Sequence, residues 1–174
     1  MQRTSYFNKC EEALAVGIRS AIFVASIALA LVMVAQVFMR YVLESPSLAI
    51  EETTTLFGVW GYFLGMVYTT RSGEHIYGGV LSLIVKDKRV LHYVRGFNSL
   101  VCFVATSIFG YFGLQYLLFV IERGKISINL GWPRDIWVAS IVVGFALMAF
   151  YFLLQTSNEF RNLRAIKEER EADQ

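Results

Sequence analysis

Charged side chains are scarce in this sequence. Asp, Glu, Lys and Arg make up 17% of its 174 residues, against roughly 25% in ordinary globular domains. Hydrophobic residues reach 56%, so much of the surface must face something other than water. The net charge of +2 is small, and the basic residues do not form one patch. We therefore expect membrane lipids around the protein and no nucleic-acid partner.

Proline and cysteine occur only twice each. Few prolines suit long helices, because proline interrupts helical hydrogen bonding. Cys10 lies in a polar N-terminal segment and Cys102 lies in an apolar run. This pattern supports neither a disulfide framework nor a metal site.

Four runs without an ionisable side chain make up half of the chain. They cover residues 20–39, 53–70, 96–121 and 136–158. About 20 helical residues cross a hydrocarbon core of about 30 Å. A soluble bundle would show a polar stripe on each helix, but residues 21–39 contain only Ser26 and Gln36 as polar residues. The sequence predicts an all-α integral membrane protein with four transmembrane helices in one membrane domain, residues 1–174.

Lysine and arginine are distributed unevenly between the two sides that four crossings define. Twelve of the 16 lie in the N-terminal segment, the second loop and the C-terminal tail, and four lie in the first and third loops. Cytoplasmic loops carry the excess of such residues. We therefore expect both termini in the cytoplasm, with residues 159–174 forming a charged, solvated tail.

The second loop contains ten uncharged residues, 76–85. This segment is too short to cross a membrane and is predicted to be interfacial or re-entrant. Lys86, Lys88 and Arg89 would anchor it to anionic head groups. His75, just before it, could be a ligand or a pH switch, but a single loop histidine is more commonly a packing or hydrogen-bonding residue. On the opposite side, Trp132 and Trp137 are predicted to be anchors in the interfacial aromatic belt.

Two features suggest how the first two spans pack. Glu51 and Glu52 precede the second span, where they either complement its helix dipole or supply a partner for Arg40 at the end of the first span. Gly58, Gly61 and Gly65 share one face of the second span. Such a face allows close helix approach in a membrane, which makes these glycines candidates for a packing surface.

No span interior carries Asp, Glu, Lys, Arg or His. Intramembrane ionisable groups usually mark proton relays and ion pathways, and a haem anchor needs ligands within its helices. Both histidines instead lie in the second loop, and there is no C-x-x-C pair. The sequence therefore predicts a non-enzymatic membrane subunit with no cofactor and no metal site.

The stretch from residue 40 to residue 81 resembles the small membrane subunit of tripartite ATP-independent periplasmic (TRAP) transporters. The matching motifs, in order, are Arg40-Tyr41, Ser45-Pro46, Glu51-Glu52, Leu64-Gly65, Arg71 and His75-Ile76. The sequence departs from the family pattern at Leu48-Ala49-Ile50, where a tryptophan is usual, and at Gly78-Gly79, where an aspartate is common. Beyond Arg95 only the topology matches.

This resemblance implies a bacterial inner-membrane protein that works with two partners, a large TRAP membrane subunit and a periplasmic substrate-binding protein. The binding protein would deliver an organic acid of the sialic acid or C4-dicarboxylate class. The large subunit would move that acid by an elevator mechanism with a sodium gradient, and would hold the sodium ions. The present chain would be its scaffold, with Arg71 and His75 also candidates for subunit packing. The alternative is an autonomous four-helix protein, either a small transporter or the anchor of a redox complex.

Overall fold

The computed structural model describes residues 2–45, 47–72 and 88–172. In element order, the helices of these residues are α1 (Gln2–Tyr41), α2 (Leu48–Ser72), α4 (Lys88–Glu122) and α5 (Asp135–Ala172). The predicted all-α class is confirmed for this part of the chain, whose β-pairing is limited to one isolated bridge between Ile126 and Pro133. The predicted interfacial segment 76–85, together with His75 and Lys86, lies outside the described residues.

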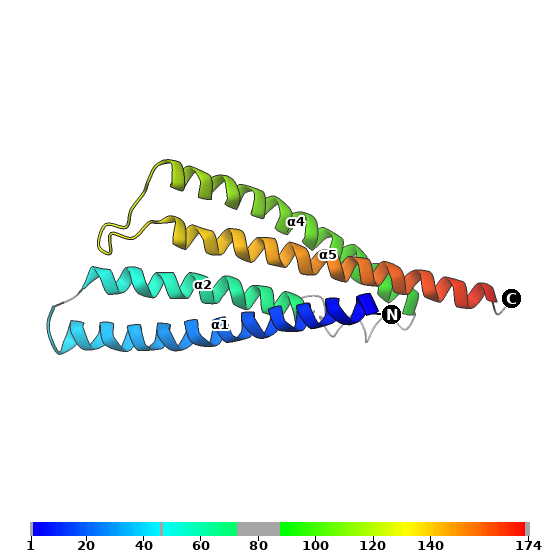
Figure 1. The fold of residues 1–174 in the computed structure, drawn as a ribbon, viewed down its shortest axis with the longest axis horizontal. Coiled ribbons are helices and arrows are strands. Elements are labelled where there is room, and N and C mark those ends of the chain that lie inside the picture. The colour runs from blue at the N-terminus through cyan, green and yellow to red at the C-terminus, as the bar shows by residue number, and fades with distance from the viewer. Residues whose placement is uncertain (1, 46, 73–87, 173–174) are drawn as a thin grey trace.

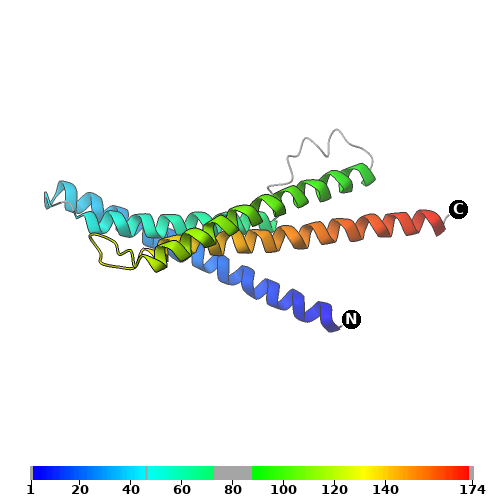
Figure 2. The same cartoon turned by 90° about the horizontal axis from the view of Figure 1, so that it is seen from above.

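The helices form an open layer in the order α1, α2, α5, α4 (Figure 1). The main contacts join α1 to α2, α2 to α5, and α5 to α4. Thus α1 and α4 form the two edges of the layer, whereas α2 lies between α1 and α5, and α5 lies between α2 and α4. Seen from above, α1 turns away from α5 towards its N-terminus (Figure 2). The arrangement is therefore a layer one helix thick.

The two ends of this layer differ. The α1–α2 and α4–α5 connections lie together at one end, which we call the loop end, and both termini lie towards the other, the terminus end (Figures 1 and 2). At the loop end the helices stop within about five residues of the predicted spans, since polar loop residues follow the apolar runs. At the terminus end α1, α4 and α5 continue into the charged segments.

In the part of the chain that the structure describes, three helices are long and apolar enough to cross a membrane: Glu11–Tyr41 in α1, His92–Glu122 in α4 and Asp135–Arg161 in α5. The second predicted span, in α2, is less apolar because it contains five threonines and three glycines. Five of its threonine hydroxyls donate to the carbonyl four residues earlier, at 2.9–3.0 Å. Those hydroxyls are therefore satisfied inside the helix.

The core lies where α1, α2 and α5 meet towards the terminus end. Its buried residues are Ile18, Leu64, Val67, Met148, Tyr151 and Phe152. The edge helices instead carry large exposed side chains, such as Phe23 and Leu31 on α1 and Phe97 and Phe112 on α4. An exposed apolar surface of this extent requires lipid or another protein to cover it.

Candidate functional site

Glu52 connects the start of α2 to the loop between α4 and α5. Its carboxylate accepts hydrogen bonds from the Ser127 hydroxyl, from the Asn129 amide at 3.0 Å and from the backbone N–H of Leu130 at 3.1 Å. We call these four residues the Glu52 cluster. The three donors lie close together in the loop, between Gly124 and Gly131. The backbone turns at these two glycines, whose positive φ angles of 53° and 68° glycine adopts readily.

The Glu52 cluster favours the ionised carboxylate. The Ser127 hydrogen bond is the largest influence and lowers the pKa of Glu52. Desolvation opposes it, while the Leu130 and Asn129 hydrogen bonds lower the pKa further. Neutral donors of the loop therefore stabilise the negative charge of Glu52. No basic side chain among the described residues forms an ion pair with it.

Two tryptophans add contacts between α2 and α5. The Trp137 indole N–H donates to the Glu52 carbonyl at 3.4 Å, and the Trp60 indole N–H donates to the Ile136 carbonyl at 3.1 Å. Deeper in the layer Phe63 packs on Gly144, where an added Cβ would lie 2.8 Å from the Phe63 Cβ. Hence α5 approaches α2 as closely as a residue without a side chain allows.

A second set of polar contacts lies towards the terminus end. The Arg71 guanidinium donates to the Glu11 carboxylate, Nε to Oε1 at 2.5 Å and Nη2 to Oε2 at 3.3 Å. Both side chains are about one-third exposed, and the Glu11 hydrogen bond raises the pKa of Arg71. The Gln155 amide donates to the Thr70 carbonyl at 2.5 Å. These contacts join α2 to both of its neighbours.

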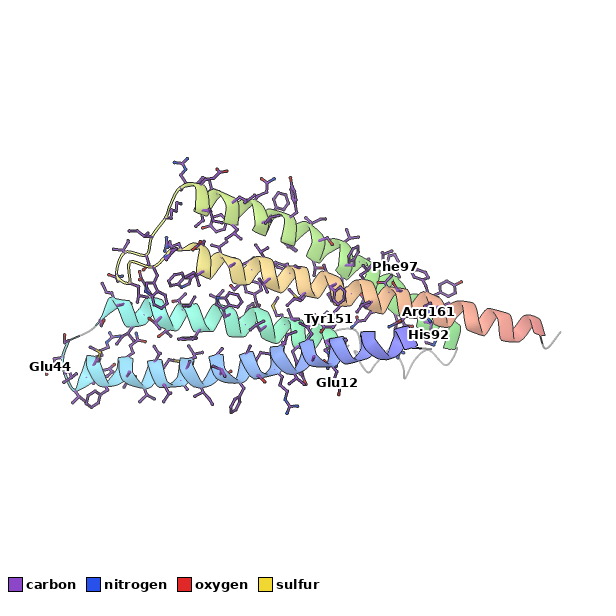
Figure 3. All side chains as sticks on the ribbon, in the orientation of Figure 1. Glu12, Glu44, His92, Phe97, Tyr151 and Arg161 are labelled. Carbon is purple, nitrogen blue, oxygen red and sulfur yellow. The ribbon has the colours of Figure 1, made fainter. Side chains whose placement is uncertain are left out.

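A histidine–carboxylate contact joins α4 to α5. His92 Nδ1 lies 2.5 Å from Glu159 Oε2, and Gly96, one turn further along α4, lets α4 approach the Glu159 Cβ. Figure 3 shows His92 near the start of α4, in the same region as Arg161 of α5, with Tyr151 nearer the middle of the layer. Thus every pair of adjacent helices has at least one polar contact across it near this end.

The pairing of Arg40 with Glu51 or Glu52 is not formed. Arg40 lies over the Tyr41 ring, 5.9 Å from its centroid. The Glu51 carboxylate accepts from the Gln36 amide of α1 at 3.4 Å, and Glu52 faces the α4–α5 loop. The two glutamates diverge because successive residues of a helix point about 100° apart, and α2 has a different neighbour on each side.

The three glycines of the second span make few contacts within the chain. Gly61 lies in ordinary van der Waals contact with Ala25, 4.0 Å from an added Cβ, whereas Gly58 and Gly65 have open space above them. The close glycine contacts are at Gly144 and at Gly113, which faces Ile141. The glycine face of α2 stays a prediction for packing against another chain.

Four of the predicted anchors lie in the described residues, and their anchoring role stays a prediction. Lys88 and Arg89 form the start of α4 at the terminus end, and Trp132 and Trp137 lie at the loop end, where Trp132 is exposed and Trp137 is partly buried. Sequence reasoning missed the partners Glu11, Ser127 and Glu159. No local pattern identifies them, because each pairs with a residue at least 60 positions away.

These features define a class of protein: an α-helical membrane protein whose polar groups connect its own helices. The described residues contain no group of three or more His, Cys, Asp and Glu side chains that could hold a metal ion. The polar clusters connect neighbouring helices and loops at both ends of the layer.

Residues 29–162 match the family described as "Tripartite ATP-independent periplasmic transporters, DctQ component", and the chain belongs to this family. It is also 28% identical over 158 residues to the sialic acid TRAP transporter permease protein SiaT of Haemophilus influenzae (strain 86-028NP). That alignment covers 90% of this chain and 24% of SiaT, so the chain spans about a quarter of the length of this relative. The protein is a TRAP transporter component, a multi-pass protein of the inner membrane, and belongs with transport proteins rather than enzymes.

Proposed function

We propose that this chain is the scaffold subunit of a sodium-driven TRAP transporter. It supports a large elevator-type subunit and carries no substrate or sodium site of its own. The observation that carries the proposal is the family match over residues 29–162. The uncharged span interiors support it, because a scaffold needs packing surface rather than ion ligands.

The proposal includes four crossings with both termini in the cytoplasm. The helix α2 has 25 residues, so at about 1.5 Å per residue it is long enough for a core of about 30 Å. The helix lies between α1 and α5, and its threonine hydroxyls are hydrogen-bonded within the helix. Both features reduce the free-energy cost of placing its polar groups in the membrane. The concentration of lysine and arginine towards the terminus end supports the orientation.

The open layer supports a scaffold role. A closed bundle would bury the apolar faces of its helices against one another, but α1 and α4 leave theirs exposed. The matched part of SiaT is about a quarter of a longer permease. We propose that a separate large subunit supplies the corresponding remainder here and covers part of this surface, while lipid covers the rest.

The proposed cargo is an organic acid delivered by a periplasmic binding protein. SiaT is named as a sialic acid transporter, which favours the sialic acid class over the C4-dicarboxylate class for this chain. Because the two chains are only 28% identical, the uptake experiment should test both classes of organic acid. The choice would be made by the large subunit and the binding protein.

Co-expression of the tagged chain with the proteins encoded beside it tests the proposal. We expect a large polytopic protein to co-purify, and sodium-dependent uptake of sialic acid or a C4-dicarboxylate by cells that contain all components. A matched strain lacking only this chain should lose uptake. Purification of the chain alone, with uptake unaffected by its deletion, would contradict the proposal. Gradient-driven uptake by liposomes that contain this chain alone would instead support the autonomous alternative.

A further inference from the structure

A cavity of about 290 Å³ lies at the loop end, among α2, α4, α5 and the α4–α5 loop. It falls at the lower limit of small-molecule sites, which measure about 300–1,000 Å³. Both α4 and α5 are apolar enough to cross a membrane, so the loop that joins them, and the cavity, lie at a membrane face. This placement does not depend on a transport role or on which face it is.

The polar wall of the cavity has an excess of positive charge. Lys125 and Arg134 line it together with Glu52. The backbone N–H of Arg134 donates to the Lys125 carbonyl at 2.9 Å, so the two cationic side chains begin from adjacent backbone positions. Neither Lys125 nor Arg134 takes part in an ion pair with another of the described residues.

The carboxylate in the cavity offsets one of these two positive charges but forms an ion pair with neither cation. Its oxygens accept hydrogen bonds from Ser127, Asn129 and Leu130 instead. The Lys125 ammonium lies 4.9 Å from the centroid of the exposed Phe119 ring. A ring contact of this kind at an exposed site is weak, and the flexible lysine side chain could exchange it for an anion.

The other wall of the cavity is mainly apolar and is formed by side chains of α4 and α5. Val120 and Tyr116 of α4 and Val138 and Trp137 of α5 line it. One turn before Tyr116, the Phe112 side chain of α4 is exposed. A ligand with an anionic group and a hydrocarbon chain matches both walls. A free hydrophilic acid would match only the polar one.

We propose that this cavity binds the head group of an anionic phospholipid. Lys125 and Arg134 contact its phosphate, and an acyl chain lies against the exposed side chains of Tyr116 and Phe112. Trp137 lies beside the glycerol region, the depth at which tryptophan is enriched in membrane proteins. The lipid would fill the space between α2 and the α4–α5 loop and so complete the loop end.

Native mass spectrometry of the purified full-length chain tests the proposal, with palmitoyl-oleoyl phosphatidylglycerol and the matching phosphatidylcholine as probes. We expect one phosphatidylglycerol to be retained in preference to phosphatidylcholine. Each basic residue near a membrane surface contributes about fivefold to such binding, so Lys125→Ala with Arg134→Ala should weaken it about thirtyfold. The charge-keeping pair Lys125→Arg with Arg134→Lys should restore it.

Arg123→Ala is the matched control, because Arg123 lies in the same loop, over Phe119, and does not line the cavity. It should leave phosphatidylglycerol affinity nearly unchanged. Equal affinity for phosphatidylcholine would overturn the proposal, as would an equal loss in Arg123→Ala. Displacement of the lipid by inorganic phosphate would show a site for free anions and would also overturn it. None of these readouts involves uptake or co-purification, so they are independent of the proposed function.

Discussion

The Ser127 hydroxyl donates a hydrogen bond to the Glu52 carboxylate across 75 positions of sequence. This contact makes the α4–α5 loop part of the α2 surface, although α2 and α4 are not neighbours in the layer. The loop is thereby held against the start of α2.

Glu52→Gln should loosen the α4–α5 loop. The substitution removes the charge that the Ser127, Asn129 and Leu130 donors share, and hydrogen bonds to an ionised acceptor are about twice as strong as neutral ones. We expect the Leu130 amide to exchange its hydrogen several-fold faster, measured by hydrogen–deuterium exchange. Glu51→Gln is the matched control, since the Glu51 carboxylate accepts a hydrogen bond only from Gln36 among the described residues. Equal exchange in both variants would show that Glu52 does not hold the loop.

The order of the same loop should depend on pH. Since the Glu52 pKa is lowered in the folded protein, its stabilising contribution is complete above the ordinary glutamate pKa. That contribution is lost as the pH falls through the lowered value. Leu130 amide protection corrected for intrinsic exchange should therefore fall at acid pH in the native chain. In Glu52→Gln it should be low and flat across the same range, and a parallel fall in both proteins would assign the effect to another group.

Arg71 and Glu11 should show coupled effects on stability. Arg71→Gln leaves the partly buried Glu11 carboxylate without its charged partner, at a cost of about 1–3 kcal/mol. Glu11→Gln in the same chain should return part of this loss, because no lone charge then remains. Thermal unfolding in detergent measures both, with Glu12→Gln, at the exposed neighbouring position, as control. Strictly additive losses would argue that the pair contributes no coupling.

Gly144→Ala should weaken the contact between α2 and α5. The new Cβ would lie 2.8 Å from the Phe63 Cβ, so the helices must separate, and overpacking of this kind costs about 1–3 kcal/mol. Gly65→Ala should leave the stability of the isolated chain nearly unchanged, because open space lies above Gly65. If Gly65→Ala lowers co-purification of a large partner while the chain stays stable, the glycine face of α2 contacts that partner.

The proposed orientation predicts which face a chemical label reaches. Ile128 at the loop end is 91% exposed, so Ile128→Cys, in a chain lacking Cys10 and Cys102, should react with a membrane-impermeant maleimide added to spheroplasts. Glu12→Cys, towards the opposite end of α1 from Glu44 (Figure 3), should react only after permeabilisation. The reverse pattern would invert the topology.

The helices could be predicted from sequence because a membrane-spanning run is a local property. The ends of α1, α2, α4 and α5 at the loop end follow directly from the charges that flank each run. Helix order could not be predicted in this way. The pairing of Arg40 with an α2 glutamate, one of the two alternatives for these residues, is not formed because α5 lies on the other side of α2 and Glu52 turns towards the α4–α5 loop.

The glycines illustrate the same limit. The pattern of Gly58, Gly61 and Gly65 is visible in the sequence, but spacing alone does not reveal which helix lies opposite. Gly144, the position of closest approach, belongs to no glycine pattern and is identified only by the position of Phe63. A periodic motif can therefore indicate a face, while its partner depends on tertiary packing.

The central position of α2 has a consequence for the order of biogenesis. The predicted span in α2 is less apolar than those in α1, α4 and α5, yet during synthesis α2 enters the membrane with α1 alone beside it. The Trp60 indole N–H and the Thr70 carbonyl of α2 form hydrogen bonds with α5. Both groups lack these partners until α5 is synthesised. A chain truncated after α4 would therefore expose these groups and become a substrate for membrane quality control, although all of α2 is present.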